Sequence, residues 1–168
     1  MSLEVTGIDD LRRKLDAVAT AVRRAARREI RAAALRIQAG ARRRLHENGT
    51  TDTGRLANSI ATEEEVSGLD YRVGTNLVYA RAIEFGLPPG YLRRMPPVDA
   101  IAGWVRRKLG IRDPREARRV AFLIARKIKR SGTDAQPYLH PAAEQERPEF
   151  LRRLNEAVNE ALIKAARG

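Results

Sequence analysis

Apolar residues recur at steps of three or four along the first third of the chain, which is the spacing of one face of an α-helix. Asp9 or Asp10 can cap the start, and only Gly40 interrupts the run. We predict a helix over residues 10–46, about 55 Å long at 1.5 Å per residue. Because this exceeds what a compact domain needs, we expect part of the helix to pack against something outside its own domain. The apolar face comprises Leu11, Leu15, Val18, Val22, Ala26, Ile30, Ala33, Ile37, Ala41 and Leu45.

A turn-forming stretch, "ENGTTDTG" (47–54), ends this helix. Asp52 or Thr53 could cap a short helical turn through the following "GRLANS". Two extended runs come next, at 59–66 and 69–76, and the two-residue Ser-Gly link between them predicts a β-hairpin.

The rest of the chain predicts helices over 77–86, 97–110 and 113–131, followed by a last helix. In the third of these, Asp-Pro followed by a glutamate is a strong start signal. Pro148 either begins the last helix or kinks one that starts near Pro141. The pattern predicts a single α+β domain over 1–168, with a long N-terminal helix, a small antiparallel β-sheet and several packing helices, including a C-terminal helix.

The net charge of +12 is unevenly distributed over the 168 residues. Residues 1–50 carry +6, 51–90 carry −3, 91–134 carry +9 and 135–168 carry zero. This charge distribution favours association with a polyanion or with acidic protein neighbours. There is no cysteine, which excludes disulfides and thiolate metal sites. We expect no membrane span, because no apolar run approaches about 20 residues. We also expect no export signal, because the N-terminal "MSLEVTGIDD" is acidic and lacks an apolar core.

Residues suited to catalysis are sparse. His46 and His140 are the only histidines, and each lies at a predicted helix end. The chain has no nucleophile elbow, no glycine-rich phosphate loop and no metal-ligand spacing. We therefore expect a protein that is not an enzyme and that needs no cofactor or metal. A hydrolase or nuclease would have to use His46 or the glutamates at 63–65, and would lose a metal-dependent activity in Glu64→Ala.

Two clusters of charge are candidates for contacts. The basic cluster on the first helix could face DNA or a sister subunit, or could simply form a solvated polar face; it comprises Arg23, Arg24, Arg27, Arg28 and Arg31. The triplet Glu63, Glu64 and Glu65 could pair with arginines of a neighbouring subunit, or could protect a sheet edge from aggregation.

Three stretches in this order, "DTGRLANSI" (52–60), "VYARAIEFG" (78–86) and "GTDAQPYLHPAAE" (132–144), resemble the tail-component family of long-tailed bacteriophages. The resemblance spans roughly 50–165, and the arginine-rich stretch at about 97–131 departs from it, since shorter relatives would have a loop there. The positions that match the family pattern are Asp52, Thr53, Gly54, Leu56, Tyr79, Ala80, Glu84, Phe85, Gly86, Pro137, Tyr138, Leu139, Pro141 and Ala142.

This resemblance implies a structural virion protein of the neck or upper tail, made in the host bacterial cytoplasm. Copies would form a homo-oligomeric ring, with sixfold symmetry favoured, that completes the tail and joins it to the head connector around the DNA channel. Its partners would be a connector or stopper, a tail terminator and the tail tube, with non-specific DNA contact and no membrane. The rival hypothesis is a small basic accessory protein that binds nucleic acid non-specifically outside the virion.

On this reading the motifs are structural. Pro137 and Pro141 pre-set the backbone, so that less conformational entropy is lost when Tyr138 and Leu139 dock as an apolar plug. The expected dock is the sheet face of Tyr71 and Val73, with Tyr79 and Phe85 nearby.

Overall fold

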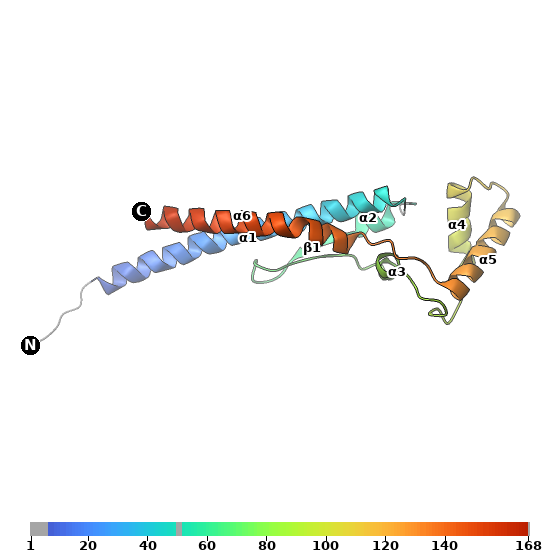
Figure 1. The fold of residues 1–168 in the computed structure, drawn as a ribbon, viewed down its shortest axis with the longest axis horizontal. Helices are drawn as coiled ribbons and strands as arrows, with labels where there is room; N and C mark the ends of the chain where they lie inside the picture. Colours follow the sequence, from blue (N-terminus) through green and yellow to red (C-terminus); the bar gives the residue numbers. More distant parts are fainter. Residues whose placement is uncertain (1–6, 50–51, 168) are drawn as a thin grey trace, which may run out of the picture. The chain divides into compact units, whose positions relative to one another are not determined.

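The computed structural model describes residues 7–49 and 52–167. These residues form six helices and a two-stranded antiparallel sheet (Figure 1), which confirms the α+β class with its long N-terminal helix. The elements are α1 (Ile8–Glu47), α2 (Arg55–Ser59), β1 (Ala61–Glu64), β2 (Tyr71–Gly74), α3 (Ala80–Phe85), α4 (Val98–Lys108), α5 (Pro114–Ser131) and α6 (Leu139–Ala166).

The described residues divide into two compact units. The first unit consists of 7–38, 62–73 and 143–167, and the second of 39–49, 52–61 and 74–142. The boundary falls inside α1, β1, β2 and α6, so that each unit combines segments distant in the sequence.

In the first unit, α6 lies beside α1 (Figure 1). Arg36 binds Glu146, whereas Ala21 and Ala25 share a groove with Ala161, so the two helices run antiparallel. The contact is built from small side chains, which let helix backbones approach closely. The apolar stripe of α1 is not covered along its whole length, because Leu11 and Leu15 are each 59% exposed.

The hairpin is confirmed, but its strands are shorter than predicted. The turn occupies residues 65–70 rather than two residues, because the Ser67 hydroxyl accepts a hydrogen bond from the N–H of Leu69 and bonds to the Asp70 carboxylate. Gly68 supplies the positive φ of 65° that the turn needs.

In the second unit, α4 and α5 pack around a small core of their own. Val105, Ala117 and Ala121 are fully buried, and half-buried Ile101 and Ile124 pack against them. The start of α5 is as predicted, since the Asp113 side chain accepts a hydrogen bond from the N–H of Arg115 and Pro114 stands in the first turn.

The last helix begins at Leu139, so the early-start alternative is correct and Pro148 lies inside α6. Pro141 falls in the first turn, where a backbone N–H has no partner within the helix and its loss costs little. A methyl group on Gly40 would lie 3.3 Å from Cβ of Ala142, so the glycine in α1 allows the first turn of α6 to come close.

Candidate functional site

The carboxylate of Glu84, near the end of α3, accepts three hydrogen bonds from the backbone at the start of α6. The N–H groups of Tyr138 and Leu139 lie 2.8 and 3.0 Å from Oε2, and that of His140 lies 2.8 Å from Oε1. The first N–H groups of a helix have no partner inside it, and the helix dipole favours negative charge there. Glu84, only 7% exposed, therefore caps a helix that begins 55 residues further along the chain.

The segments on either side of this cap are also joined through their backbones. Leu87 and Thr133 exchange two hydrogen bonds of 2.9 Å, and the N–H of Gln136 donates to the carbonyl of Ile83 at 2.8 Å. We call residues 83–87 and 132–140 the motif junction, because they bring the second and third sequence motifs together.

Two glycines make this close approach possible. Gly132 has a φ of 73°, and a Cβ there would lie 1.8 Å from the carbonyl oxygen of Leu87. Gly86 has a φ of 71°, and its Cβ would lie 2.6 Å from the carbonyl oxygen of Thr133. Both the backbone conformation and the lack of space therefore require glycine at these positions.

Tyr138 is 3% exposed, whereas Leu139, the other residue of the expected plug, is only half-buried. The pKa of Tyr138 is raised mainly by burial, and to a smaller extent by electrostatic interaction with Glu84 and Tyr79. Phe85, which we expected beside the plug, is 70% exposed and does not cover it. The sheet face of Tyr71 and Val73 belongs to the other unit, and that part of the expected dock stays a prediction.

The first motif is used differently from the prediction. Gly54, with a φ of 73°, occupies the N-cap position of α2, so neither Asp52 nor Thr53 is the cap. The carboxylate of Asp52 instead binds the guanidinium of Arg107 in α4, with Nε 2.9 Å from Oδ1 and a second bond from Nη2. This hydrogen bond lowers the pKa of Asp52. The motif thus ties the loop before α2 to α4.

The first and second motifs meet around a small cavity of about 210 Å³. Leu45 of α1, residues 52–57, Tyr79 and Ile83 line it, and Leu56 is 8% exposed. The structure therefore brings motif residues that are far apart in the sequence to one place in the second unit. Sequence reasoning missed the cap made by Glu84, although a lone carboxylate in a short apolar helix was an available signal.

The five arginines of the basic cluster fall within one 140° arc of α1, at 100° per residue. Arg27 is engaged inside the chain, because its guanidinium donates to the carbonyls of Gly68 and Ser67 at 3.3 Å and lies 3.7 Å from the Glu64 carboxylate. It holds the hairpin turn against α1. Arg24, Arg28 and Arg31 line a shallow groove together with Tyr71.

The glutamate triplet is not a uniform strip. Glu64 lies beside Arg27, and Glu65 binds Arg72 at 2.8 Å. Only Glu63 is exposed with no ion pair among the residues that the structure describes.

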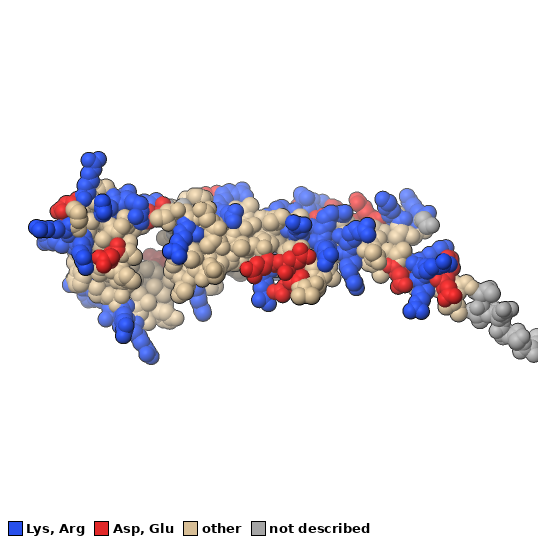
Figure 2. Space-filling model, turned by 180° about the vertical axis from the view of Figure 1, so that it is seen from behind, with Lys and Arg blue, Asp and Glu red and all other residues tan. Residues whose placement is uncertain are grey.

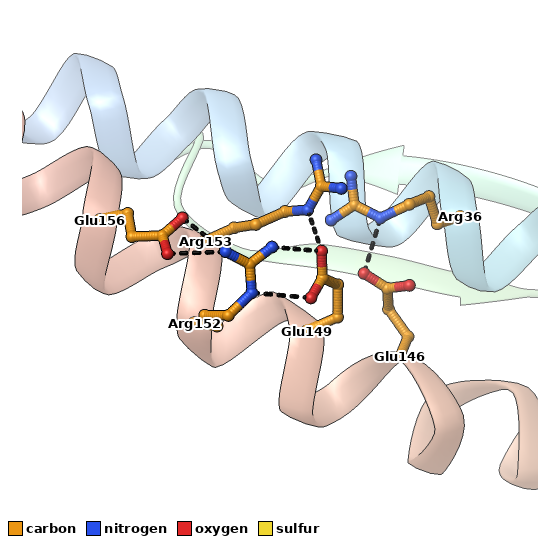
Figure 3. A network of polar contacts seen from close by, with 6 residues as sticks. All are labelled: Arg36, Glu146, Glu149, Arg152, Arg153 and Glu156. Carbon is orange, nitrogen blue, oxygen red and sulfur yellow. Dashed lines mark hydrogen bonds and ion pairs between the residues drawn. The ribbon is translucent and has the colours of Figure 1, made fainter.

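A network of ion pairs lies along α6 (Figure 3). Glu149 binds Arg152 at 2.7 Å and Arg153 at 2.6 Å, and Arg152 also binds Glu156 at 2.6 Å. Arg152 first, and then Arg153, lower the pKa of Glu149 to about 2. The separations of three and four residues are those of neighbours on a helix surface, and they stabilise α6 locally.

The remaining surface combines charge with an apolar groove. Lys and Arg side chains protrude over much of the face drawn in Figure 2, with smaller groups of Asp and Glu between them. In the second unit a groove of about 1110 Å³ is lined largely by apolar side chains. Among them Val78 is 96% exposed and Tyr91 65% exposed. This groove has room for a segment of another molecule.

Residues 9–86 match the model of a protein family described as "Bacteriophage HK97-gp10, putative tail-component". This part of the chain is similar to the HK97-gp10-like family. The HK97-gp10-like segment includes the long helix, the hairpin and the first two motifs. The resemblance seen in the sequence motifs did not depend on the long helix. The third motif and the helices α4 and α5 lie beyond it.

No curated protein and no solved structure matches the chain. The family description is consistent with a structural protein of the phage tail that interacts with other tail proteins in the virion, and it suggests a role other than catalysis. Within residues 7–49 and 52–167, no helix is long and apolar enough to cross a membrane, and no group of three His, Cys, Asp or Glu side chains could hold a metal ion.

Proposed function

We propose that this protein is a structural component of the neck or upper tail of a tailed bacteriophage. Copies form a ring, with six subunits favoured, that completes the tail and joins it to the head connector around the DNA channel. The observation that carries the proposal is the match of residues 9–86 to a phage tail-component family. The motif residues support it, because Glu84, Gly86 and Asp52 hold the chain together and leave its surfaces free for neighbours.

A cyclic ring needs a heterologous interface, in which one surface fits a different surface on the next copy. Two unlike surfaces qualify. One is the exposed apolar start of α1, where Leu11 and Leu15 lie beside the acidic Asp9 and Asp10. The other is the apolar groove of the second unit, whose lining includes Arg81 and Arg94. An amphipathic helix laid in an apolar groove is a common recognition mode, and the charges are complementary.

The channel-facing surface is proposed to be the basic face of α1. Arg23, Arg24, Arg28 and Arg31 would attract passing DNA weakly and without sequence preference, whereas Arg27 is occupied by the hairpin. Glu63 is the member of the triplet proposed to pair with a sister copy. If these arginines point away from the axis of the ring, the basic face of α1 does not line the channel.

The decisive experiment locates the protein in particles. Purified virions are imaged with an antibody or a density tag on the C-terminal end, and the mass of the protein is measured alone and with tail proteins. The proposal expects label at the head–tail joint and a ring-sized species with partners. A monomer that stays out of particles would instead favour the alternative, a small basic accessory protein that binds nucleic acid.

A further inference from the structure

The helical hairpin of α4 and α5 lies outside the family match and is the most basic part of the chain. Residues 97–131 contain 11 basic and 3 acidic side chains, a net charge of +8. The hairpin has its own core around Val105, Ala117 and Ala121. Its charge is therefore carried by a compact element with a defined outer surface.

The outer face of α5 presents a straight row of arginines. Arg115, Arg119, Arg126 and Arg130 are exposed and lie opposite the buried alanines of the helix. Their separations of four, seven and four residues keep them on one side of an α-helix, over about 22 Å at 1.5 Å per residue.

These charges are not neutralised within the chain. Among the residues that the structure describes, Arg118 pairs with Asp99 and Arg107 with Asp52, but no carboxylate pairs with the four arginines of the row. A row of unpaired guanidinium groups is suited to phosphates, which they bind through paired hydrogen bonds.

A membrane surface fits this face less well. An interfacial helix needs an apolar face for the lipid, whereas the apolar face of α5 is already buried against α4. On the outer side, Phe122 and Leu123 are 47% and 56% exposed and stand among arginines, so they do not form a continuous apolar surface.

We propose that the outer face of α5, formed by Arg115, Arg119, Phe122, Arg126 and Arg130, binds the phosphate backbone of double-stranded DNA without sequence preference. Duplex DNA carries about one charge per 1.7 Å of axis, so 22 Å offers roughly 13 phosphates to four arginines. Phe122 lies between Arg119 and Arg126 in the row and adds an apolar contact with the sugars. The inference does not depend on a ring, and it assigns DNA binding to a site other than α1.

The test measures binding of the full chain to a labelled duplex of arbitrary sequence by fluorescence anisotropy, as a function of NaCl concentration. Four phosphate contacts predict a slope of log K against log salt of about −3.6, so affinity should fall on the order of 100-fold from 50 to 200 mM. In the double variant R119Q/R126Q the slope should fall to about −1.8, with roughly a tenfold loss over the same range.

The matched control is R12Q/R43Q, which removes two exposed arginines of α1 and changes the net charge equally. It should leave the slope unchanged, and circular dichroism should show both variants folded. Equal weakening by both variants would overturn the proposal, because net charge alone would then explain binding. Equal affinity for polyglutamate would also overturn it, by assigning the face to an acidic protein. Failure here leaves the ring unaffected, since particle location tests that separately.

Discussion

The carboxylate of Glu84 accepts a hydrogen bond from the backbone N–H of Tyr138, a residue 54 positions further along the chain. This one contact explains why a short apolar helix and a proline-framed aromatic segment belong together. The carboxylate accepts from N–H groups that have no partner within the helix, and the bond to Tyr138 holds the backbone of a residue whose side chain is buried. The cap and the plug are thus two parts of one joint.

Removal of the cap should destabilise the protein strongly. In Glu84→Ala, three N–H groups at the start of α6 lose their acceptor, and we expect a loss of about 3 kcal/mol in the free energy of unfolding. Urea denaturation followed by circular dichroism measures it. Glu63→Ala is the control, because this glutamate is exposed, and a change within about 0.5 kcal/mol is expected. Equal stability of the two variants would contradict the capping role.

Gly132 and Gly90 offer a test in which the backbone conformation is matched. Gly132 and Gly90 have φ angles of 73° and 74°, but only Gly132 has a neighbour in the way, the carbonyl of Leu87. Gly90→Ala should cost about 1 kcal/mol from the left-handed conformation alone.

Gly132→Ala should cost roughly 1–3 kcal/mol more, because the added methyl group forces the backbone of the motif junction apart. The difference in the midpoint of urea unfolding isolates the steric contribution. Identical midpoints would mean that the close approach to Leu87 is not required.

Local signals predicted the local structure well. The signals that specify α5 are local: Asp113 and Pro114 mark its start, and the apolar spacing follows directly. The bounds of α5 are as expected. The long helix follows from the same kind of periodicity. By contrast, the extent of the hairpin turn depends on how the Ser67 hydroxyl is used, which residue spacing does not reveal.

The long-range contacts were less predictable. That Tyr138 is buried follows from its proline frame, but that Glu84 caps the helix depends on a meeting between segments 55 residues apart. Aspartate is a favoured N-cap residue and Asp52 precedes α2, yet the guanidinium of Arg107 in α4 binds its carboxylate instead. The tertiary structure determines which partner each side chain binds, because several partners would satisfy the same side chain equally well.

The bond between Asp52 and Arg107 should appear as coupling in a double-mutant cycle. D52N and R107Q each remove one side of the same paired contact, so the double variant should lose little more stability than either single variant. The free energy of unfolding of all four proteins provides the coupling. Arg106→Gln, on the adjacent exposed residue, should combine additively with D52N. Additive behaviour of D52N with R107Q would mean that the contact does not stabilise the fold.

The network on α6 should make stability depend on acidity in a defined window. The guanidiniums of Arg152 and Arg153 lower the pKa of Glu149 from 4.5 to about 2. A carboxyl whose pKa is lowered on folding adds stability above its unfolded value, and this contribution disappears as the pH falls through the folded value. The native protein should therefore lose stability relative to Glu149→Gln as the pH falls from 4.5 towards 2.

Unfolding midpoints measured across this window test the expectation. The difference between the native protein and Glu149→Gln should shrink at low pH, and also in 1 M salt, where the Debye length is only about 3 Å and these exposed charges are screened. Glu144→Gln, at an exposed position of α6 with no ion pair among the described residues, should follow the native curve. A constant difference between Glu149→Gln and the native protein from pH 4.5 to 2 would mean that the network does not hold Glu149 ionised.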